Sequence, residues 1–473
     1  MKNKTLTYTR SNGYQKLAPA ELKKLEALAS LYRSFLGKAK TERLAHDAAL
    51  KALKEAGFQD LDALVRGKAA LKPGDKVYRS SSGKTLLAAV IGRRPLEDGL
   101  HIVGSHMDSP RLDVKPNPLY ESGEMALLDT HYYGGIKKYQ WVAMPLALHG
   151  VFIKKDGRKV SVSIGEDAND PVFCITDLLP HLGQDQMRKT MADGIEGENL
   201  DVLAGSIPSK SAKAKEKIKQ RMLEILHERY GVTEEDFLSA ELEFVPAGAP
   251  REGGLDRSLI IGYGQDDRAC AFTALQALLD VAQTPDYTAC VLLVDKEEIG
   301  SYGATGMESR FFENSIAEML GLCRAAYSEL TLKRALSRSW MLSADVNSAF
   351  DPLYPAVSEK KNAALLNHGT CLTKYTGSRG KSGGSDAGAE FLAEIRRIFA
   401  ANHVTWQAGE LGKVDQGGGG TIAWLMARYG MEVVDCGAPL LSMHAPWEVS
   451  GKFDVYMTYK GYLAFLKDKR RKP

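Results

Sequence analysis

The 473-residue chain has no apolar run that approaches the roughly 20 residues of a membrane-spanning helix. Its first residues, MKNKTLTYTR, are basic, but no apolar segment follows them, so we expect no secretory signal peptide. Neither sign of charge dominates, because 62 basic residues stand against 59 acidic ones and the net charge is +3. We therefore expect neither a nucleic acid nor a membrane surface as a partner.

Cysteine is scarce, and its spacing argues against two classes of site. The cysteines form no CxxC pair, and several lie in apolar stretches such as YTACVLLVD. This pattern is typical of small buried side chains in a reducing compartment, not of a disulfide framework or a thiolate zinc site. We therefore expect a cytoplasmic protein in which His, Asp and Glu would hold any metal. The six cysteines are Cys174, Cys270, Cys290, Cys323, Cys371 and Cys436.

Two common enzyme signatures are also missing. The run GGGG (417–420) is expected to open a helix, but it lacks the Lys-Ser/Thr of a nucleotide-binding P-loop. Close packing of a strand against a helix is the interpretation that we favour for these glycines over an anion site. No Gly-x-Ser-x-Gly turn accompanies a Ser/His/Asp order, which counts against a serine hydrolase.

The residues that are present predict an α/β fold. A composition of 44% hydrophobic and 26% charged residues is typical of a globular protein, and the length predicts two or three domains. Because the strand-like segments are almost continuously apolar and alternate with helical ones, we expect a mostly parallel sheet flanked by helices. We expect strands at 85–92, 99–108, 287–295, 339–346, 403–409 and 431–437, and helices at 20–56 (one or two), 268–283, 308–330, 385–401, 418–429 and 452–468.

The middle of the chain departs from this alternation. Residues 140–166 contain the turn KKDGRK between two strand-like runs, which indicates a β-hairpin. A Lys-rich segment, 211–231, is expected to form an exposed helix. We therefore expect residues 118–255 to form an inserted, β-rich domain, and residues 1–117 and 256–473 to form one discontinuous catalytic domain.

The stretch LLVDKEEIGSYGATG places two adjacent carboxylates, Glu297 and Glu298, at the end of an apolar run. One explanation is a solvated loop. The other is a metal site in which one glutamate binds a cation and its neighbour moves a proton. At the end of a strand adjacent side chains alternate, so one would face the metal and the other the substrate.

Other strand-like runs end in residues that could complete such a site. His106 and Asp108 are two residues apart, so they point to the same side of an extended chain, and Asp108 can orient the imidazole. Taken singly, the remaining candidates have ordinary explanations as helix caps, turn residues or loop histidines. Open α/β sheets, however, gather their ligands at the carboxyl ends of the strands. The remaining candidates are Asp266, Asp267, Asp345 and His444.

Two histidines and three carboxylates, one of them bridging, would form a two-metal site. The order His-x-Asp, Asp-Asp, Glu-Glu, Asp, His is similar to that of the co-catalytic metallopeptidases. The blocks GSHMDSPRLDVKPNP, DKEEIGSYGATG, SADVNSAFDP and SMHAPWEV resemble the aspartyl aminopeptidase family. They extend from about residue 100 to 450, so the resemblance covers nearly the whole chain.

The resemblance implies a zinc-peptidase type of fold, peptide substrates and two divalent ions per subunit. Zinc is the expected metal, with cobalt or manganese as substitutes. It further implies that Glu297 is the general base, that Asp108 orients His106 and that Asp266 bridges the ions, with Asp267 as the alternative bridge. The implied metal ligands are His106, Asp266, Glu298, Asp345 and His444.

The resemblance also implies a homo-oligomer. In the family the insertion dimerises, and dimers assemble into a dodecamer. The segment WVAMPLALHGVFI offers the apolar surface and strand edges that a dimer interface needs. His181 would reach the active site of the neighbouring subunit and contact substrate there; the alternative is a surface histidine at a helix end.

Three alternatives for the function stay open. A deacylase or a carboxypeptidase could use the same dinuclear site, and an inactive metal-binding scaffold is disfavoured because Glu297 is present. The family name implies a preference for N-terminal Asp or Glu, which needs a basic pocket. Lys374, Arg379 and Lys381 lie in a Gly-rich loop, residues 373–388, which could be a carboxylate clamp or a solvated loop.

Overall fold

The apolar strands of the two ends of the chain form one nine-stranded sheet, in a computed structural model that describes residues 6–323 and 327–469. The sheet order is β1-β2-β3-β13-β4-β14-β18-β16-β17, and the four central strands from β13 to β18 run parallel. Parallel central strands bring their carboxyl ends to one edge of the sheet. The strands are β1 (Gln59–Asp60), β2 (Lys76–Ser81), β3 (Thr85–Val90), β4 (Leu100–His106), β13 (Thr288–Val294), β14 (Trp340–Ser343), β16 (Thr370–Thr373), β17 (Trp406–Ala408) and β18 (Glu432–Gly437).

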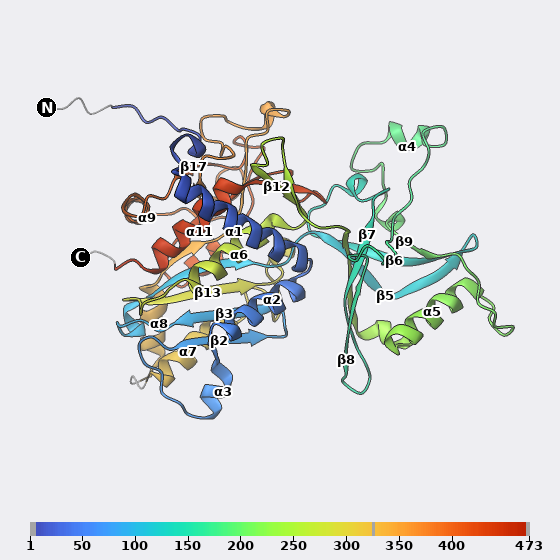
Figure 1. Ribbon diagram of the computed structural model, residues 1–473, viewed down its shortest axis with the longest axis horizontal. Helices are drawn as coiled ribbons and strands as arrows, with labels where there is room; N and C mark the ends of the chain where they lie inside the picture. The colour runs from blue at the N-terminus through green and yellow to red at the C-terminus, as the bar shows by residue number, and fades with distance from the viewer. Residues whose placement is uncertain (1–5, 324–326, 470–473) are drawn as a thin grey trace.

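Helices cover both faces of this sheet (Figure 1). Both faces need cover because alternate residues of β13 are apolar on opposite sides. Val291 and Leu293 pack into one apolar cluster, while Leu292 and Val294 pack into the other. The predicted α/β class with a mostly parallel, helix-flanked sheet is confirmed. One cluster receives α1 (Pro19–Lys38), α2 (Glu42–Glu55), α6 (Gln265–Leu279), α9 (Ala389–Ala401) and α11 (Lys452–Leu466); the other receives α3 (Leu61–Arg66), α7 (Phe311–Leu322), α8 (Glu329–Ser337) and α10 (Ala423–Ala427).

A six-stranded antiparallel sheet forms a second lobe, at the right of Figure 1. The expected hairpin is present, and its strands β7 and β8 pair from Leu148↔Ile164 to Ile153↔Lys159 around the KKDGRK turn. The sheet has its own apolar core, which includes the buried Trp141. Its elements are β5 (Arg111–Ser122), β6 (Met125–Tyr133), β7 (Leu146–Ile153), β8 (Lys159–Ile164), β9 (Val202–Gly205) and β10 (Ala240–Pro246), with α4 (Gln184–Arg188) and α5 (Lys217–Tyr230).

A small five-stranded sheet, which the sequence pattern did not predict, lies next to the carboxyl edge of the central strands. Asp266 follows its strand β12, and His444 lies between its strands β19 and β20. It therefore carries two of the candidate ligands. The strands are β11 (Arg251–Gly253), β12 (Leu259–Gly262), β15 (Asn347–Ser348), β19 (Pro439–Leu441) and β20 (Glu448–Gly451).

Several predicted boundaries are wrong. The prediction of one or two helices in 20–56 is confirmed, because two form there, whereas the segment 308–330 contains α7, the beginning of α8 and residues outside the described ranges. The run 417–420 does not open a helix, because α10 begins only at Ala423. Gly417 and Gly418 instead lie in irregular chain pressed against other backbone: a Cβ on Gly417 would lie 1.7 Å from the carbonyl oxygen of Leu411. In the described ranges no helix is long and apolar enough to cross a membrane.

Candidate metal centre and active site

The candidate site residues line one cavity of about 730 Å³. It opens at the carboxyl ends of the parallel strands, where β4 delivers His106, β14 leads into Asp345 and β13 leads into the two glutamates. Residues of the loops 373–388 and 409–421 also line the cavity. The predicted residues that line it are His106, Asp266, Glu297, Glu298, Asp345 and His444.

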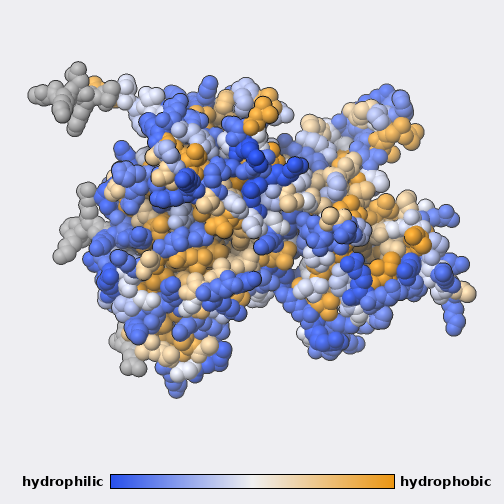
Figure 2. All heavy atoms as spheres, in the orientation of Figure 1, coloured by the Kyte–Doolittle hydropathy of each residue, from blue (hydrophilic) through white to orange (hydrophobic). Residues whose placement is uncertain are grey.

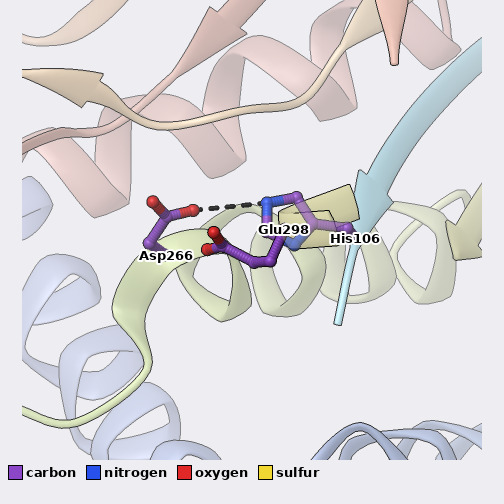
Figure 3. A group of neighbouring side chains, drawn as sticks. All are labelled: His106, Asp266 and Glu298. Atoms are coloured by element: carbon purple, nitrogen blue, oxygen red, sulfur yellow. Dashed lines mark ion pairs between the residues drawn. The ribbon is translucent and has the colours of Figure 1, made fainter. Parts of the chain in front are cut away.

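The Asp266 carboxylate lies between the two histidines. Its Oδ1 is 3.3 Å from His106 Nε2 and its Oδ2 is 3.2 Å from His444 Nε2. Although burial opposes it, hydrogen bonding to the two imidazoles holds the pKa of Asp266 below its usual range. Figure 3 shows the side chains of His106, Asp266 and Glu298 pointing toward one another. Each oxygen of this carboxylate thus faces a different imidazole, as a bridging ligand requires.

Two groups of possible ligand atoms share Asp266. His106, Asp266 and Glu298 form one group, and Asp266, Asp267 and Asp345 form the other; in each, the ligand atoms lie within 4.8 Å of one another. Glu298 Oε1 and Asp267 Oδ1 are buried and lack a hydrogen-bond partner among the described residues. Burial and then the charge of Asp267 raise the pKa of Asp345. So many uncompensated buried acids fit a site for divalent cations, whose charge would lower these pKa values.

Asp267 differs from Asp266 in what it contacts. Its Oδ2 accepts a hydrogen bond from Ser105 Oγ at 2.5 Å, whereas Asp266 faces both histidines. The geometry therefore favours Asp266 over Asp267 as the bridge. The backbone of both residues is non-helical, and of the two only Asp266 lines the cavity.

Glu297 and Glu298 stand on a 3-10 turn, η6 (Glu297–Ile299), and not at the end of a strand as predicted. Lys296, with a φ of 68°, turns the chain out of β13 before the glutamates. The Asp108 carboxylate holds this turn: Oδ1 accepts from Glu297 N and Oδ2 from Glu298 N, both at 3.2 Å. Burial raises the pKa of Glu297 to about 7, although His106 opposes the rise.

A comparison with protein families identifies the chain. The model described as "Aminopeptidase I zinc metalloprotease (M18)" matches residues 35–466. The chain belongs to the M18 aminopeptidase family. It is therefore a zinc metallo-aminopeptidase. This membership favours peptide hydrolysis over the deacylase alternative.

Relatives and solved structures support this membership. A probable M18 family aminopeptidase 1 of Clostridium acetobutylicum is 52% identical over 457 residues, which cover 97% of this chain and 98% of that protein. The crystal structure of an M18 aminopeptidase from Thermotoga maritima, 44% identical, superposes with a TM-score of 0.92 and covers 98% of this chain and 100% of that one. The mApe1 dodecamer of S. cerevisiae, 21% identical with a TM-score of 0.75 and coverages of 94% and 97%, shares the fold.

Asp108 in this M18 chain does more than the sequence suggested. His106 Nδ1 is 3.0 Å from the Asp108 carbonyl oxygen and 3.3 Å from its Oδ1. The residue is fully buried. It therefore contacts both His106 and the turn that carries the glutamate pair.

Sequence reasoning missed Glu448, a fully buried residue of the M18 site. Its Oε2 accepts from Gln265 N at 2.6 Å and Asp266 N at 3.1 Å, and its Oε1 accepts from His444 N at 2.8 Å. It thus connects the backbones of two candidate ligands. The available signal was an acid four residues after His444 in an otherwise apolar PWEV stretch.

The remaining candidates lie farther from the ligands. His181 is exposed in the turn before α4 and does not line the cavity of its own chain. Lys374 and Lys381 both bind Asp386, each with an Nζ to oxygen distance of 2.8 Å. Arg379 and Lys381 line the cavity, and Lys374 does not.

Proposed function

We propose that this M18 aminopeptidase acts through a dinuclear metal site in which Glu297 moves the proton. The observation that carries the proposal is the Asp266 carboxylate, which faces one histidine with each oxygen. Around it, His106, Glu298, Asp345 and His444 would supply the remaining ligands of the two ions. Zinc is the expected metal, because imidazole and carboxylate ligands suit it.

Two bound divalent ions would acidify water and polarise the carbonyl of the peptide bond. The chain's own residues do the rest. Glu297 lies in the cavity beside the ligands, and a pKa near 7 suits a group that must both accept and donate a proton. In this proposal Glu297 accepts a proton from the attacking water and returns it to the leaving amine.

Asp108 and Glu448 would hold this arrangement without touching substrate. Asp108 fixes the backbone amides of both glutamates, and Glu448 fixes the amides of Asp266 and His444. Because a misplacement of about 1 Å can slow an enzyme 10²-fold, such fixed backbones support catalysis.

A preference for N-terminal Asp or Glu has limited support in the cavity. Lys374 and Lys381 both pair with Asp386, so Arg379 is the best candidate to bind an acidic side chain. Lys413 also lines the cavity, near Glu410 and Asp415. We propose that any acidic preference depends on Arg379.

We further propose a homo-oligomer whose subunits meet through the second lobe, expected at 118–255. Hydrophobic residues, drawn in orange, gather at the upper tip of this lobe, over α4 (Figure 2). There the side chains of Leu178, Leu179, Leu182, Met187 and Met191 are each more than half exposed. Such a surface is typical of an interaction site. The dodecameric yeast relative supports the same assembly, and His181 lies within this segment.

The metal requirement tests the proposed function directly. Removal of metal with a chelator should abolish release of the N-terminal residue, and added zinc, cobalt or manganese should restore it. Metal content would be measured in the same samples. Full activity in a sample shown to be free of metal would contradict the proposal, and zinc binding without any hydrolysis would favour the scaffold alternative.

The free cysteines are compatible with the expected cytoplasmic compartment.

A further inference from the structure

The last residues of β6 approach the candidate metal centre from the six-stranded sheet. The strand ends in HYY, and two glycines, Gly134 and Gly135, follow. Because side chains alternate along a strand, the two tyrosines face opposite ways. Tyr133 is 7% exposed and faces the interior, while Tyr132 is 42% exposed.

Tyr133 is fixed on the side chain that orients His106. Its hydroxyl donates a hydrogen bond to Asp108 Oδ2 at 2.9 Å. The guanidinium of Arg111 covers its ring, 3.7 Å from the centroid, and Arg111 is also its backbone partner across β5 and β6. A tyrosine held on one face by a cation and at its hydroxyl by a carboxylate has little freedom to move.

The following backbone contacts the second histidine. The Gly135 carbonyl oxygen is 3.1 Å from His444 Nδ1. A carbonyl can only accept, so this nitrogen carries a hydrogen, and Nε2, which faces Asp266 and Glu298, is the nitrogen that would bind a metal. His106 is arranged in the same way, since its Nδ1 meets the Asp108 carbonyl oxygen.

The two glycines allow this close approach. Gly134 has a φ of +74°, and a Cβ there would lie 3.3 Å from Glu298 Cβ. A Cβ on Gly135 would lie 3.3 Å from His444 Nδ1. Side chains at these positions would press on the candidate ligands, so the chain passes them as bare backbone.

We propose that residues 133–135 are a positioning segment that fixes both His106 and His444 for metal binding. The inference rests on the proposed metal site. It adds that a strand of the six-stranded sheet helps to set the affinity of that site for zinc. Partners of this kind fix the tautomer and the ring orientation of ligating histidines, and their loss typically costs about 10–100-fold in metal affinity.

Tyr133→Phe tests the segment, because it removes the hydroxyl and keeps the ring against Arg111. The zinc Kd, measured by competition with a chelating dye, should rise about 10–100-fold. Tyr132→Phe is the matched control, since it removes a hydroxyl from the outward-facing neighbour and should leave the Kd unchanged. In the cobalt-loaded proteins, only Tyr133→Phe should shift the visible absorption bands that report ligand geometry.

Gly134→Ala provides a second, independent variant. Its methyl group would press on Glu298, and it should weaken zinc binding while the metal-free Tm reports whether the fold is intact. His106→Ala separates the inference from the site on which it rests. If His106→Ala loses zinc but Tyr133→Phe keeps the wild-type zinc Kd and cobalt spectrum, the positioning role of residues 133–135 is wrong and the proposed metal site stands. If His106→Ala retains two tightly bound zinc ions, both are overturned.

Discussion

At the scale of single residues, Glu297 and Glu298 have the same side chain and different surroundings. The Glu298 side chain is 4% exposed and lies 3.5 Å from His444, so the solvated-loop alternative is wrong. Among the described residues, no ion pair joins Glu297 to a histidine. Burial raises the pKa of Glu297 to about 7. Surroundings of this kind divide two adjacent acids into a ligand and a proton carrier.

Substitutions in the pair should separate these roles. Glu297→Gln keeps the shape but cannot accept a proton, so kcat should fall by at least about 10²-fold, the usual scale for loss of a general base. Zinc content, measured by elemental analysis, should hardly change. Glu298→Gln should instead lower zinc occupancy. The opposite pattern would mean that the two roles are exchanged.

The candidate residues could be found from the sequence because chemistry-bearing side chains followed apolar strands. Glu448 left only the weak signal of an acid close after His444, and Tyr133 left none, because their partners Asp266 and Asp108 are distant in the sequence. The turn under Glu297 was also missed, because nothing in the string DKEE signals the positive φ of Lys296.

At the scale of elements, long buried strands were predictable and glycine-rich connections were not. The strands β4 and β13 are buried on both faces and mostly apolar, so the sequence alone indicates their positions. Gly417 to Gly420 have no side chains to indicate a partner, and their contacts are with backbone far along the chain, such as Gly377 N to Gly419 O. The short strands of the five-stranded sheet carry too few residues to show a period.

The loop 373–388 gives a prediction about specificity. If Arg379 binds acidic side chains, Arg379→Ala should lower kcat/KM for N-terminal Asp or Glu about two- to fivefold more than for Leu, the scale of an exposed ion pair. Lys374→Ala is the control, because Lys374 lies outside the cavity and is paired with Asp386. Aminoacyl substrates of each type would be compared. Equal losses for all of them would rule out a clamp at Arg379.

At the scale of the whole molecule, the six-stranded sheet overlaps most of the block that we propose as an inserted domain. The six-stranded sheet extends from Arg111 to Pro246, against a predicted block of 118–255. The hairpin turn and the change of pattern identified it, whereas the approach of β6 to the metal centre could not be inferred, because it depends on how the two lobes pack.

The oligomer gives the last prediction. If His181 completes the site of a neighbour, His181→Ala should impair turnover and leave zinc content and assembly, measured by sedimentation, unchanged. Gln184→Ala in the same exposed segment is the control. Mixing His181→Ala subunits with Glu297→Gln subunits, under exchange, should restore activity above either parent, because some sites then contain both residues. A fully active monomer, or no recovery despite exchange, would contradict action across subunits.

The five-stranded sheet has a consequence for biosynthesis. His106 is translated before most of the second lobe, whereas His444 and Glu448, in the turn and strand next to β19, are translated after it. Domains fold in order as they leave the ribosome, so the contiguous second lobe can form while these residues are still missing. The growing polypeptide therefore carries no complete pair of histidines. The proposed metal site is therefore completed only after His444 and Glu448 have joined a lobe that can already be folded.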